Sequence, residues 1–261
     1  MFKKNINEVV CEMNGEHSNM LMDVKTYKLA KGEEKEFYED KKEMAILLID
    51  GYGRVNWEGE QRQVKRNSLF DEEPTCLHVC KDVKVIVSAT EDMEILVQCT
   101  DNENVFQSQF YSPENIKSDI FGEGVLQGTS RRVVRTVFDY NNAPYSNMVM
   151  GEVITYPGKW SSYIPHHHPQ PEVYYYRFDK EQGFGVSIIG EEAFVIKDRS
   201  AAFIPGGLTH PQTSAPGYAM YYCWMIRHLK DNPWTDRVED EAHTWMLKDN
   251  AKIWEGKRNE K

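Results

Sequence analysis

The chain has 261 residues, of which 40% are hydrophobic and 28% are charged, and its formal net charge is −10. These proportions are typical of a globular protein and exclude a disordered chain. An acidic chain without a long Lys/Arg cluster is a poor candidate for binding nucleic acid or anionic lipid. The densest apolar cluster, Met44–Ile49, is too short to span a bilayer, and no signal peptide is recognisable at the start. Five scattered cysteines without a CxxC pair indicate reduced thiols, so we expect a cytoplasmic protein.

The dominant pattern is that of β-strands, because runs rich in valine and aromatic residues recur between glycine, proline, asparagine and aspartate. In the first half the predicted strands are Met20–Leu29, Glu34–Tyr38, Met44–Gly51, Gly53–Trp57, Val83–Ala89 and Met93–Cys99. In the second half they are Val133–Phe138, Met148–Tyr156, Glu172–Phe178, Phe184–Ile189, Ala193–Ile196, Ala201–Ile204 and Ala219–Arg227. The glycines at Gly51 and Gly53 indicate a hairpin turn. One helix is predicted over Glu239–Leu247.

Many short strands in two groups predict an all-β protein of two tandem barrels or jelly rolls. We expect an N-terminal barrel over residues 1–105, a linker over 106–130, and a C-terminal barrel with a tail over 131–261. His17 and His78 are isolated in the first half, where a structural or surface role is expected for both. A metal site is therefore expected only in the second barrel.

The most informative segment is PHHHPQPEVYYYRF, residues 165–178, because it holds three consecutive histidines. Side chains alternate between faces in an extended segment, so His166 and His168 should point to one side and His167 away from it. Glu172 opens the strand that follows. Imidazole nitrogens and a carboxylate oxygen on one side are typical ligands of a divalent metal. Taken alone, a solvated His-rich turn is the alternative interpretation.

A fourth ligand is expected from IPGGLTHP, residues 204–211, where a Pro-Gly-Gly turn follows a short apolar strand and presents His210. Alone, His210 could equally be a surface-loop histidine. Combined with the first cluster, it completes a predicted metal site, whose ligands are His166, His168, Glu172 and His210.

These two segments resemble the paired motifs of the cupin superfamily, HxH followed by Glu, and Pro-x-Gly-x-x-His. Further stretches, GKWSSYIPHHH, EVYYYRF, QGFGV and APGYAMYY with an NPW-containing tail, are similar to the 5-deoxy-glucuronate isomerase (IolB) family of bacterial inositol catabolism. The resemblance runs from about Arg131 to Trp234. It implies a two-barrel cupin that interconverts an aldehyde uronic acid and its ketose isomer. It also implies a divalent metal: zinc, with manganese, iron and nickel as alternatives.

An aldose–ketose isomerisation moves a proton between adjacent carbons, and a divalent metal can polarise the carbonyl. Glu172 is a candidate base, and Tyr174 and Tyr176 share its face. These tyrosines can donate or accept a proton once a neighbour lowers a tyrosine pKa, or they are simply core. A uronate carboxylate suits arginine, and Arg132 and Arg135 are the candidates. Their odd spacing excludes that both face inward, and Arg132 matches the family position best.

The leading hypothesis is a metal-dependent aldose–ketose isomerase, an intramolecular oxidoreductase, acting on a uronic or deoxy-uronic acid. Two alternatives stay open. One is a metallo-cupin dioxygenase, because three His and one Glu hold iron, manganese, copper or nickel in other cupins. The other is a non-catalytic sugar-binding bicupin. The expected partner is a small-molecule sugar acid, with no nucleic acid and no membrane. Because cupins pair through sheet edges, we expect a homo-oligomer.

Overall fold

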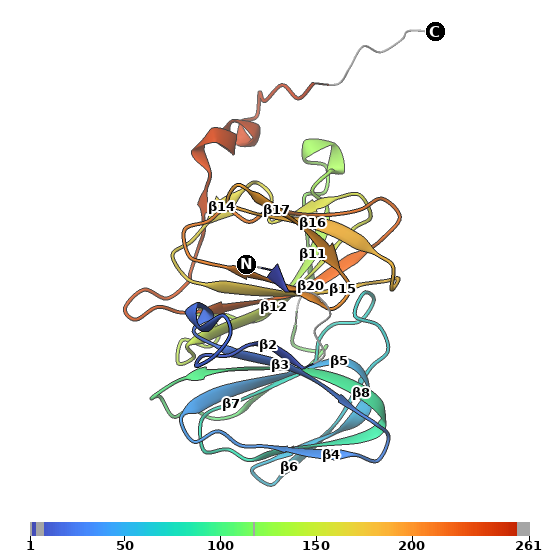
Figure 1. Cartoon of the computed structure of the whole chain (residues 1–261), viewed down its shortest axis with the longest axis vertical. Coiled ribbons are helices and arrows are strands. Elements are labelled where there is room, and N and C mark those ends of the chain that lie inside the picture. The colour runs from blue at the N-terminus through green and yellow to red at the C-terminus, as the bar shows by residue number, and fades with distance from the viewer. Residues whose placement is uncertain (1, 4–7, 117, 255–261) are drawn as a thin grey trace.

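Strand-forming residues dominate the chain, and the structure, a computed structural model, describes residues 2–3, 8–116 and 118–254. Figure 1 shows two β-units, one above the other, with the first half of the chain in the lower unit. The helices among the described residues are short 3₁₀ segments, η1 (Ser18–Met20), η2 (Leu126–Gly128) and η3 (Glu241–Leu247). The all-β prediction is therefore confirmed, and the predicted C-terminal helix is the 3₁₀ helix η3. Within the same residues, no helix is long and apolar enough to cross a membrane.

The first unit is an eight-stranded antiparallel sheet organised by two long strands, β5 (Lys42–Trp57) and β8 (Val85–Asp101). Its order is β2-β3-β8-β5-β7-β9, and β4 and β6 pair with the remaining lengths of β8 and β5. The shorter strands are β2 (Val9–Cys11), β3 (Asp23–Leu29), β4 (Glu34–Phe37), β6 (Glu60–Arg66), β7 (Cys76–Val79) and β9 (Gln109–Tyr111). The long strands thus join two layers of one jelly roll, and the sheet is not closed into a barrel.

The predicted hairpin at Gly51 and Gly53 is wrong, because β5 runs through both glycines. Its register with β8 shifts at two places, between Leu48 and Asp50 and between Gly51 and Gly53. Such bulges bend a strand without turning it back. A Cβ on Gly51, whose φ is +102°, would lie 2.3 Å from the carbonyl oxygen of Asp92. Glycine is therefore required for the bend and close strand contact, and not for a turn.

Two other predictions for the first half also need correction. The strands predicted over Val83–Ala89 and Met93–Cys99 are parts of the single strand β8. Strands β6 and β7 were not predicted, because β6 is rich in polar and charged residues and β7 is only four residues long.

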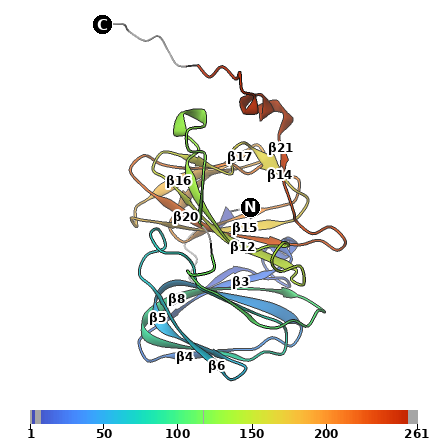
Figure 2. The same ribbon diagram turned by 180° about the vertical axis from the view of Figure 1, so that it is seen from behind.

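The second unit contains a seven-stranded sheet, in the order β1-β18-β15-β20-β12-β11-β10, and a four-stranded sheet, β13-β19-β16-β17. A two-stranded ladder, β14-β21, lies at the end away from the first unit (Figure 2). The strands are β1 (Phe2–Lys3), β10 (Ser118–Phe121), β11 (Arg132–Phe138), β12 (Met148–Thr155), β13 (Trp160–Ser161), β14 (His166–His167), β15 (Glu172–Phe178), β16 (Phe184–Ile189), β17 (Glu192–Lys197), β18 (Ser200–Ile204), β19 (Gln212–Ser214), β20 (Met220–Arg227) and β21 (Val238–Glu239).

Residues 106–130, which we predicted to be a linker, contribute a strand to each unit. β9 pairs with β7 in the first unit, and β10 pairs with β11 at the edge of the second. The N-terminal strand β1 likewise pairs with β18 in the second unit. The predicted domain boundaries at 105 and 131 stay a prediction.

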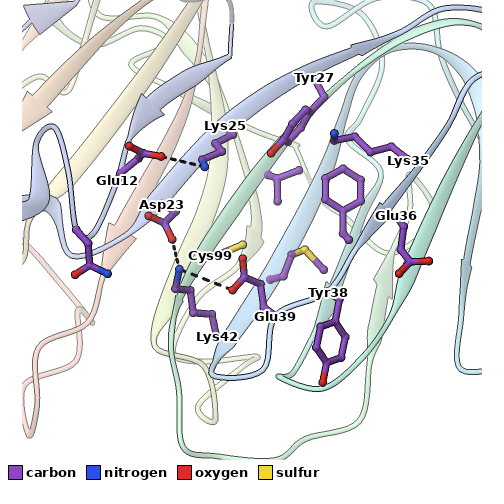
Figure 3. A pocket seen from close by; sticks show the side chains of 14 residues that line it. Glu12, Asp23, Lys25, Tyr27, Lys35, Glu36, Tyr38, Glu39, Lys42 and Cys99 are labelled. Atoms are coloured by element: carbon purple, nitrogen blue, oxygen red, sulfur yellow. Dashed lines mark hydrogen bonds and ion pairs between the residues drawn. The ribbon is translucent and has the colours of Figure 1, made fainter.

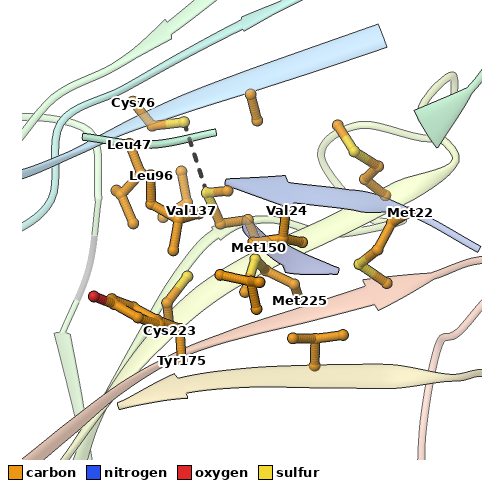
Figure 4. Close-up of a cluster of buried hydrophobic side chains, with 14 of the residues drawn as sticks. Met22, Val24, Leu47, Cys76, Leu96, Val137, Met150, Tyr175, Cys223 and Met225 are labelled. Carbon is orange, nitrogen blue, oxygen red and sulfur yellow. Dashed lines mark hydrogen bonds between the residues drawn. The ribbon is translucent and has the colours of Figure 1, made fainter. Parts of the chain in front are cut away.

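Strand alternation divides the buried side chains into a layer inside each unit and a layer between the units. In β15, for example, Glu172 and Tyr174 face the interior of the second unit, whereas Val173 and Tyr175 face the first unit. The layer between the units includes Val24, Leu47, Cys76, Leu96, Met150, Tyr175, Cys223 and Met225 (Figure 4). Both faces of β12, β15 and β20 are therefore buried. One face packs against the first unit, and the other faces the interior of the second unit, where a site can form.

A buried ion pair crosses this layer. Arg66 of the first unit donates from both terminal nitrogens to the Glu152 carboxylate of the second, each at 2.7 Å. The Tyr221 hydroxyl donates to the same carboxylate at 2.8 Å, and Arg135 approaches it at 3.5 Å. The two units are thus joined by charge as well as by apolar packing.

Candidate active site

A cavity of about 210 Å³ lies in the second unit, between the seven-stranded sheet and the loops that lead to β14 and β21. Its lining comes from β11, β15 and β20 on one side and from the histidine segment and the C-terminal region on the other. Alternation in β15 and β20 supplies Glu172 and Tyr174 from one strand and Tyr222 and Trp224 from its neighbour. This volume is below the usual range for sites of drug-sized ligands, so it suits a single monosaccharide at most.

Each histidine of the two motifs has one ring nitrogen fixed by a backbone carbonyl. Nδ1 of His166 donates to the carbonyl oxygen of Ile164 at 2.9 Å, and Nδ1 of His210 donates to that of Leu208 at 2.9 Å. Nδ1 of His168 is 3.0 Å from the carbonyl oxygen of Gln170. A carbonyl oxygen only accepts, so Nδ1 carries the proton and Nε2 presents a lone pair.

Two of these lone pairs, those of His168 and His210, point at one carboxylate. Oε2 of Glu172 is 3.2 Å from Nε2 of His168 and 3.3 Å from Nε2 of His210, and all three residues are buried. Nε2 of His210 has no hydrogen-bond partner among the described residues. Three acceptor atoms in contact repel one another unless a cation lies among them. Ligand atoms about 2.1 Å from one ion lie about 3 Å apart, so this group fits a divalent metal.

His166 lies beside this group but is not one of its three members. Its ring centroid is 4.8 Å from that of His210, and its side chain lines the same cavity. His167 is half-buried, and it is absent from the cavity lining, as the alternation of an extended segment predicts. The predicted ligand set of His166, His168, Glu172 and His210 stays a prediction.

Burial keeps two of these imidazoles neutral. It lowers the pKa of His166 to about 3, and it lowers the pKa of His210 to about 4 against the opposing charge of Glu172. A neutral imidazole is the form that binds a metal.

The two histidine loops are held together by backbone contacts. The backbone N–H of Gly207 donates to the carbonyl oxygen of His168 at 2.8 Å. A Cβ on Gly206 would lie 1.9 Å from the carbonyl oxygen of Pro169, so glycine is required for this approach. The Pro-Gly-Gly turn therefore fixes the loop carrying His210 against the segment carrying His168.

The two candidate tyrosines occupy different positions. Tyr174 lines the cavity, and its hydroxyl is 3.1 Å from the hydroxyl of Ser162. Tyr176 lies two residues further along β15, where its hydroxyl donates to the side chain of Gln212 at 2.6 Å, and it is not in the lining. Gln212 in turn donates to the backbone carbonyl of His210. Tyr176 thus supports the His210 loop from behind.

Neither candidate tyrosine has the lowered pKa that proton transfer by its hydroxyl would require. Burial raises the pKa of Tyr174 well above its ordinary value, and the charge of Glu172 adds to this. Burial also raises the pKa of Tyr176 well above its ordinary value. Both hydroxyls therefore stay protonated at neutral pH, and that of Tyr174 is available as a hydrogen-bond donor.

Arg132 is a buried cation in the cavity wall. Its side chain is only 6% exposed, and it donates to the backbone carbonyls of Ser130 and Tyr163 at 2.8 and 3.3 Å. None of the described carboxylates forms an ion pair with it. Burial lowers the pKa of this guanidinium, although arginine remains charged at neutral pH. A buried, unpaired guanidinium facing a cavity is suited to bind an anion.

Arg135 does not reach this cavity. Its odd spacing from Arg132 turns it to the other face of β11, where it donates to the backbone carbonyls of Leu69 and Glu72, each at 2.8 Å. It also approaches Glu152 between the units. The structure therefore gives Arg135 a contact between the units and leaves Arg132 as the predicted arginine in the cavity.

Nine lining residues were not predicted as site residues, and the polar and aromatic ones include Ser162, Tyr222, Trp234 and Arg237. Tyr222 could have been inferred from strand alternation in Ala219–Arg227. Trp234 and Arg237 lie in an irregular segment with no periodicity. The NPW stretch, which includes Trp234, bears on the family resemblance and does not by itself indicate a site.

Comparison with known proteins gives the family of the chain. The model of the KduI/IolB family matches residues 1–246. The 5-deoxy-glucuronate isomerase of Geobacillus kaustophilus (strain HTA426) is 26% identical over 235 residues, covering 80% of this chain and 83% of that protein. The enzyme of the same name from Bacillus subtilis (strain 168) is 23% identical over 261 residues, covering 92% and 93%.

Solved structures support the fold. The crystal structure of an IolB-like protein from Salmonella typhimurium LT2 has a TM-score of 0.80 at 20% identity, covering 87% of this chain and 90% of that one. The Lactobacillus farciminis oxalate decarboxylase formate complex has a TM-score of 0.65 at 12% identity, covering 92% and 86%.

The predicted cupin fold of two jelly rolls is confirmed by these structures, and the curated relatives confirm a 5-deoxy-glucuronate isomerase-like enzyme of the aldose–ketose type. The likeness is not confined to the histidine motifs. Because the family model spans nearly the whole sequence, the chain belongs to the KduI/IolB family.

Proposed function

We propose that this chain is a metal-dependent aldose–ketose isomerase acting on a uronic or deoxy-uronic acid, within inositol catabolism. One observation carries the proposal. The acceptor cluster of His168, Glu172 and His210 contributes two of its members, His168 and Glu172, to the wall of the monosaccharide-sized cavity that the unpaired guanidinium of Arg132 also lines. A cation site and an anion anchor in one small cavity suit a substrate that carries a carbonyl and a carboxylate. The relatives named 5-deoxy-glucuronate isomerase support the same substrate class.

His168, Glu172 and His210 would hold the metal, and His166 beside them is the proposed fourth ligand. A bound divalent ion supplies Lewis-acid polarisation of the substrate carbonyl and its neighbouring hydroxyl. Zinc is the ion we propose, because zinc prefers a set of histidine nitrogens with one carboxylate. Manganese, iron and nickel are the alternatives.

The chain's own residues supply the remaining functions. Arg132 anchors the substrate carboxylate and so orients the sugar acid in the cavity. Glu172 is the only carboxylate among the described lining residues, so it is the group that can accept the migrating proton when it loosens from the metal. The protonated hydroxyl of Tyr174 can donate a hydrogen bond to a substrate oxygen. Tyr176 and Arg135 support the fold around the site and do not contact substrate.

The enzyme that we propose is cytoplasmic and takes a small free sugar acid as its substrate. The exposed apolar side chains of Ile120 and Phe121 on the edge strand β10 suit a homo-oligomer, whose order a mass measurement in solution would give. The narrow cavity supports a monosaccharide and argues against an oligosaccharide chain.

The test combines metal analysis with NMR of candidate deoxy-uronates in D₂O. We expect about one divalent ion per chain and deuterium exchange at the carbon next to the carbonyl, together with appearance of the ketose isomer. An apoprotein prepared with a chelator should lose both signals and regain them with the metal. Oxygen consumption measured in the same samples distinguishes the two enzyme hypotheses, because a dioxygenase requires O₂ and an isomerase does not. Binding of the sugar acid without exchange would favour the non-catalytic alternative.

A further inference from the structure

The C-terminal strap, which we define as residues 229–240, closes one side of the cavity. It leaves the end of β20 and returns to pair with the histidine strand, since β21 is hydrogen-bonded to β14 with Glu239 opposite His166. Two more contacts hold it: the Gln170 side chain donates to the carbonyl of Asn232 at 2.8 Å, and the backbone N–H of Asp240 donates to the carbonyl of Pro165 at 2.9 Å. Figure 2 shows β21 beside β14.

Two side chains of the strap line the cavity, Trp234 and Arg237. The indole ring of Trp234 lies 5.7 Å from that of Trp224 and 6.3 Å from the ring of His168, measured between centroids. Arg237 lies nearer the solvent, with 39% of its side chain exposed, and the nearest carboxylate is that of Glu239 at 3.6 Å. The strap therefore adds an aromatic wall and a cation to the cavity.

The charges of the cavity are unbalanced by this second arginine. The lining contains two guanidinium groups, Arg132 and Arg237, against the single carboxylate of Glu172, which already contacts two histidines. The positive charge of Arg237 adds to burial in lowering the pKa of Arg132, which indicates that the two groups are close. Like charges facing one small cavity repel, and an anion between them removes the repulsion.

On the basis of the proposed function, we propose that Arg237 is a second substrate-binding residue, which contacts the carboxylate of the sugar acid from the strap while Arg132 contacts it from the sheet. Two guanidinium groups can offer a carboxylate more hydrogen bonds than one can. The partly exposed Arg237 also attracts the anion at the mouth of the cavity. The ligand class is therefore a monosaccharide carboxylate, and neutral sugars should be bound more weakly.

The experiment measures binding of D-glucuronate and of D-glucose by calorimetry, with the full chain both metal-free and metal-loaded, at low and high salt. We expect Arg237→Gln to weaken D-glucuronate binding about tenfold at low salt and to reduce the salt dependence, because the residue is partly exposed. Arg237→Lys should retain part of the affinity. D-Glucose binding should change by less than about twofold.

Arg131→Gln is a matched control. The Arg131 side chain is 38% exposed and lies 3.4 Å from Glu123, almost the same setting as that of Arg237, but it is outside the cavity. This variant should bind D-glucuronate like the wild type. The inference is overturned if Arg237→Gln binds D-glucuronate like the wild type, or loses D-glucose binding equally, which would indicate a merely structural role. A wild type that prefers D-glucuronate no more than D-glucose overturns it as well.

The same variants separate this inference from the proposed function. If the wild type isomerises a uronate and Arg237→Gln keeps its kcat/KM and its affinity, the inference fails and the proposed function stands. If Arg237→Gln weakens D-glucuronate binding but the wild type converts no uronate, the inference stands and the proposed function fails.

Discussion

The two units are built from similar antiparallel sheets, but different side chains line the spaces in their interiors. In the first, apolar side chains such as Ile46, Leu77 and Phe110 leave a void of about 10 Å³. That space is hardly enough for one water molecule. In the second, the corresponding interior keeps a cavity of about 210 Å³. A duplicated fold therefore accommodates a packed core in one copy and a site in the other.

The first unit also has a larger cavity, of about 440 Å³, whose lining combines charged side chains with buried core residues such as Met44 and Cys99 (Figure 3). Its charged side chains are largely paired with one another: Lys25 lies 3.1 Å from Glu12, and Lys42 contacts Asp23 and Glu39. In the second unit, by contrast, the buried guanidinium of Arg132 donates its hydrogen bonds to backbone carbonyls and forms no ion pair with a described carboxylate. Cavity size alone thus does not mark a site.

The largest expected effect comes from removing a proposed metal ligand. His210→Ala should reduce bound metal from about one ion per chain to nearly none, and activity by about a thousandfold or more, because the Lewis acid is lost. Elemental analysis and the isomerase assay measure both. The control is His78→Gln in the first unit, where buried His78 pairs with Glu43 at 2.8 Å. That variant should lose stability and keep its metal, and a loss of metal there would contradict the comparison.

The layer shared by the units gives the next largest effect. Arg66→Met leaves the buried carboxylate of Glu152 without its bidentate partner, so the free energy of unfolding should fall by about 3–5 kcal/mol in urea titrations. The double variant Arg66→Met/Glu152→Met should recover most of that loss. Lys25→Met, which breaks the exposed pair with Glu12, should cost less than about 1 kcal/mol. Equal losses of unfolding free energy in Lys25→Met and Arg66→Met would show that the buried ion pair between the units stabilises the fold no more than an exposed one.

A smaller effect, on substrate binding and turnover, is expected from replacing Arg132, the proposed carboxylate-binding residue. Arg132→Gln should lower kcat/KM for the uronate by about 30-fold or more, because a buried charge-assisted contact is lost. Metal content should be unchanged, and a neutral sugar accepted by the site should react as before. Wild-type kcat/KM in Arg132→Gln would mean that the carboxylate is bound elsewhere or that the substrate has none.

Much of the second unit could be predicted from the sequence, because its local pattern is unambiguous. The strands Glu172–Phe178 and Phe184–Ile189 match β15 and β16 to the residue. Aromatic and branched residues fill them, and turn residues bound them. The candidate ligands could be predicted for a similar reason, since the spacing of His166, His168 and Glu172 determines which side chains share a face.

What could not be predicted depends on contacts between distant residues. Gly51 has the same local appearance in a bulge as in a turn, and only the pairing of β5 with β8 distinguishes the two. Arg237 enters the cavity because β21 pairs with β14, and nothing in the strap's own sequence indicates that partner. Likewise Arg135 and Arg132 look equivalent as cations, and their different roles follow from what packs on each face of β11.

The smallest expected effect concerns His228, which directly precedes the C-terminal strap in the second unit. Its Nδ1 accepts a hydrogen bond from the backbone N–H of Trp234 at 2.8 Å, so the imidazole must be neutral at that atom. Burial lowers the pKa of His228 to about 4, and the charge of Arg227 adds to this, while Glu43 and Asp139 oppose it. The ring of Tyr140 packs against it edge-on.

In the unfolded chain this histidine titrates near pH 6.5, so between about pH 6.5 and 4 the unfolded state binds more protons than the folded state. The stability that His228 contributes is therefore complete above about pH 6.5 and is lost as the pH falls, by about 1–3 kcal/mol at most. His228→Gln keeps an acceptor and cannot titrate. The difference between the wild-type and His228→Gln unfolding free energies, measured from pH 7.5 to 5, removes the contributions of the other histidines. As the pH falls, the wild type should lose more unfolding free energy than His228→Gln. Parallel profiles of the two proteins would show that a protonated His228 still holds the strap.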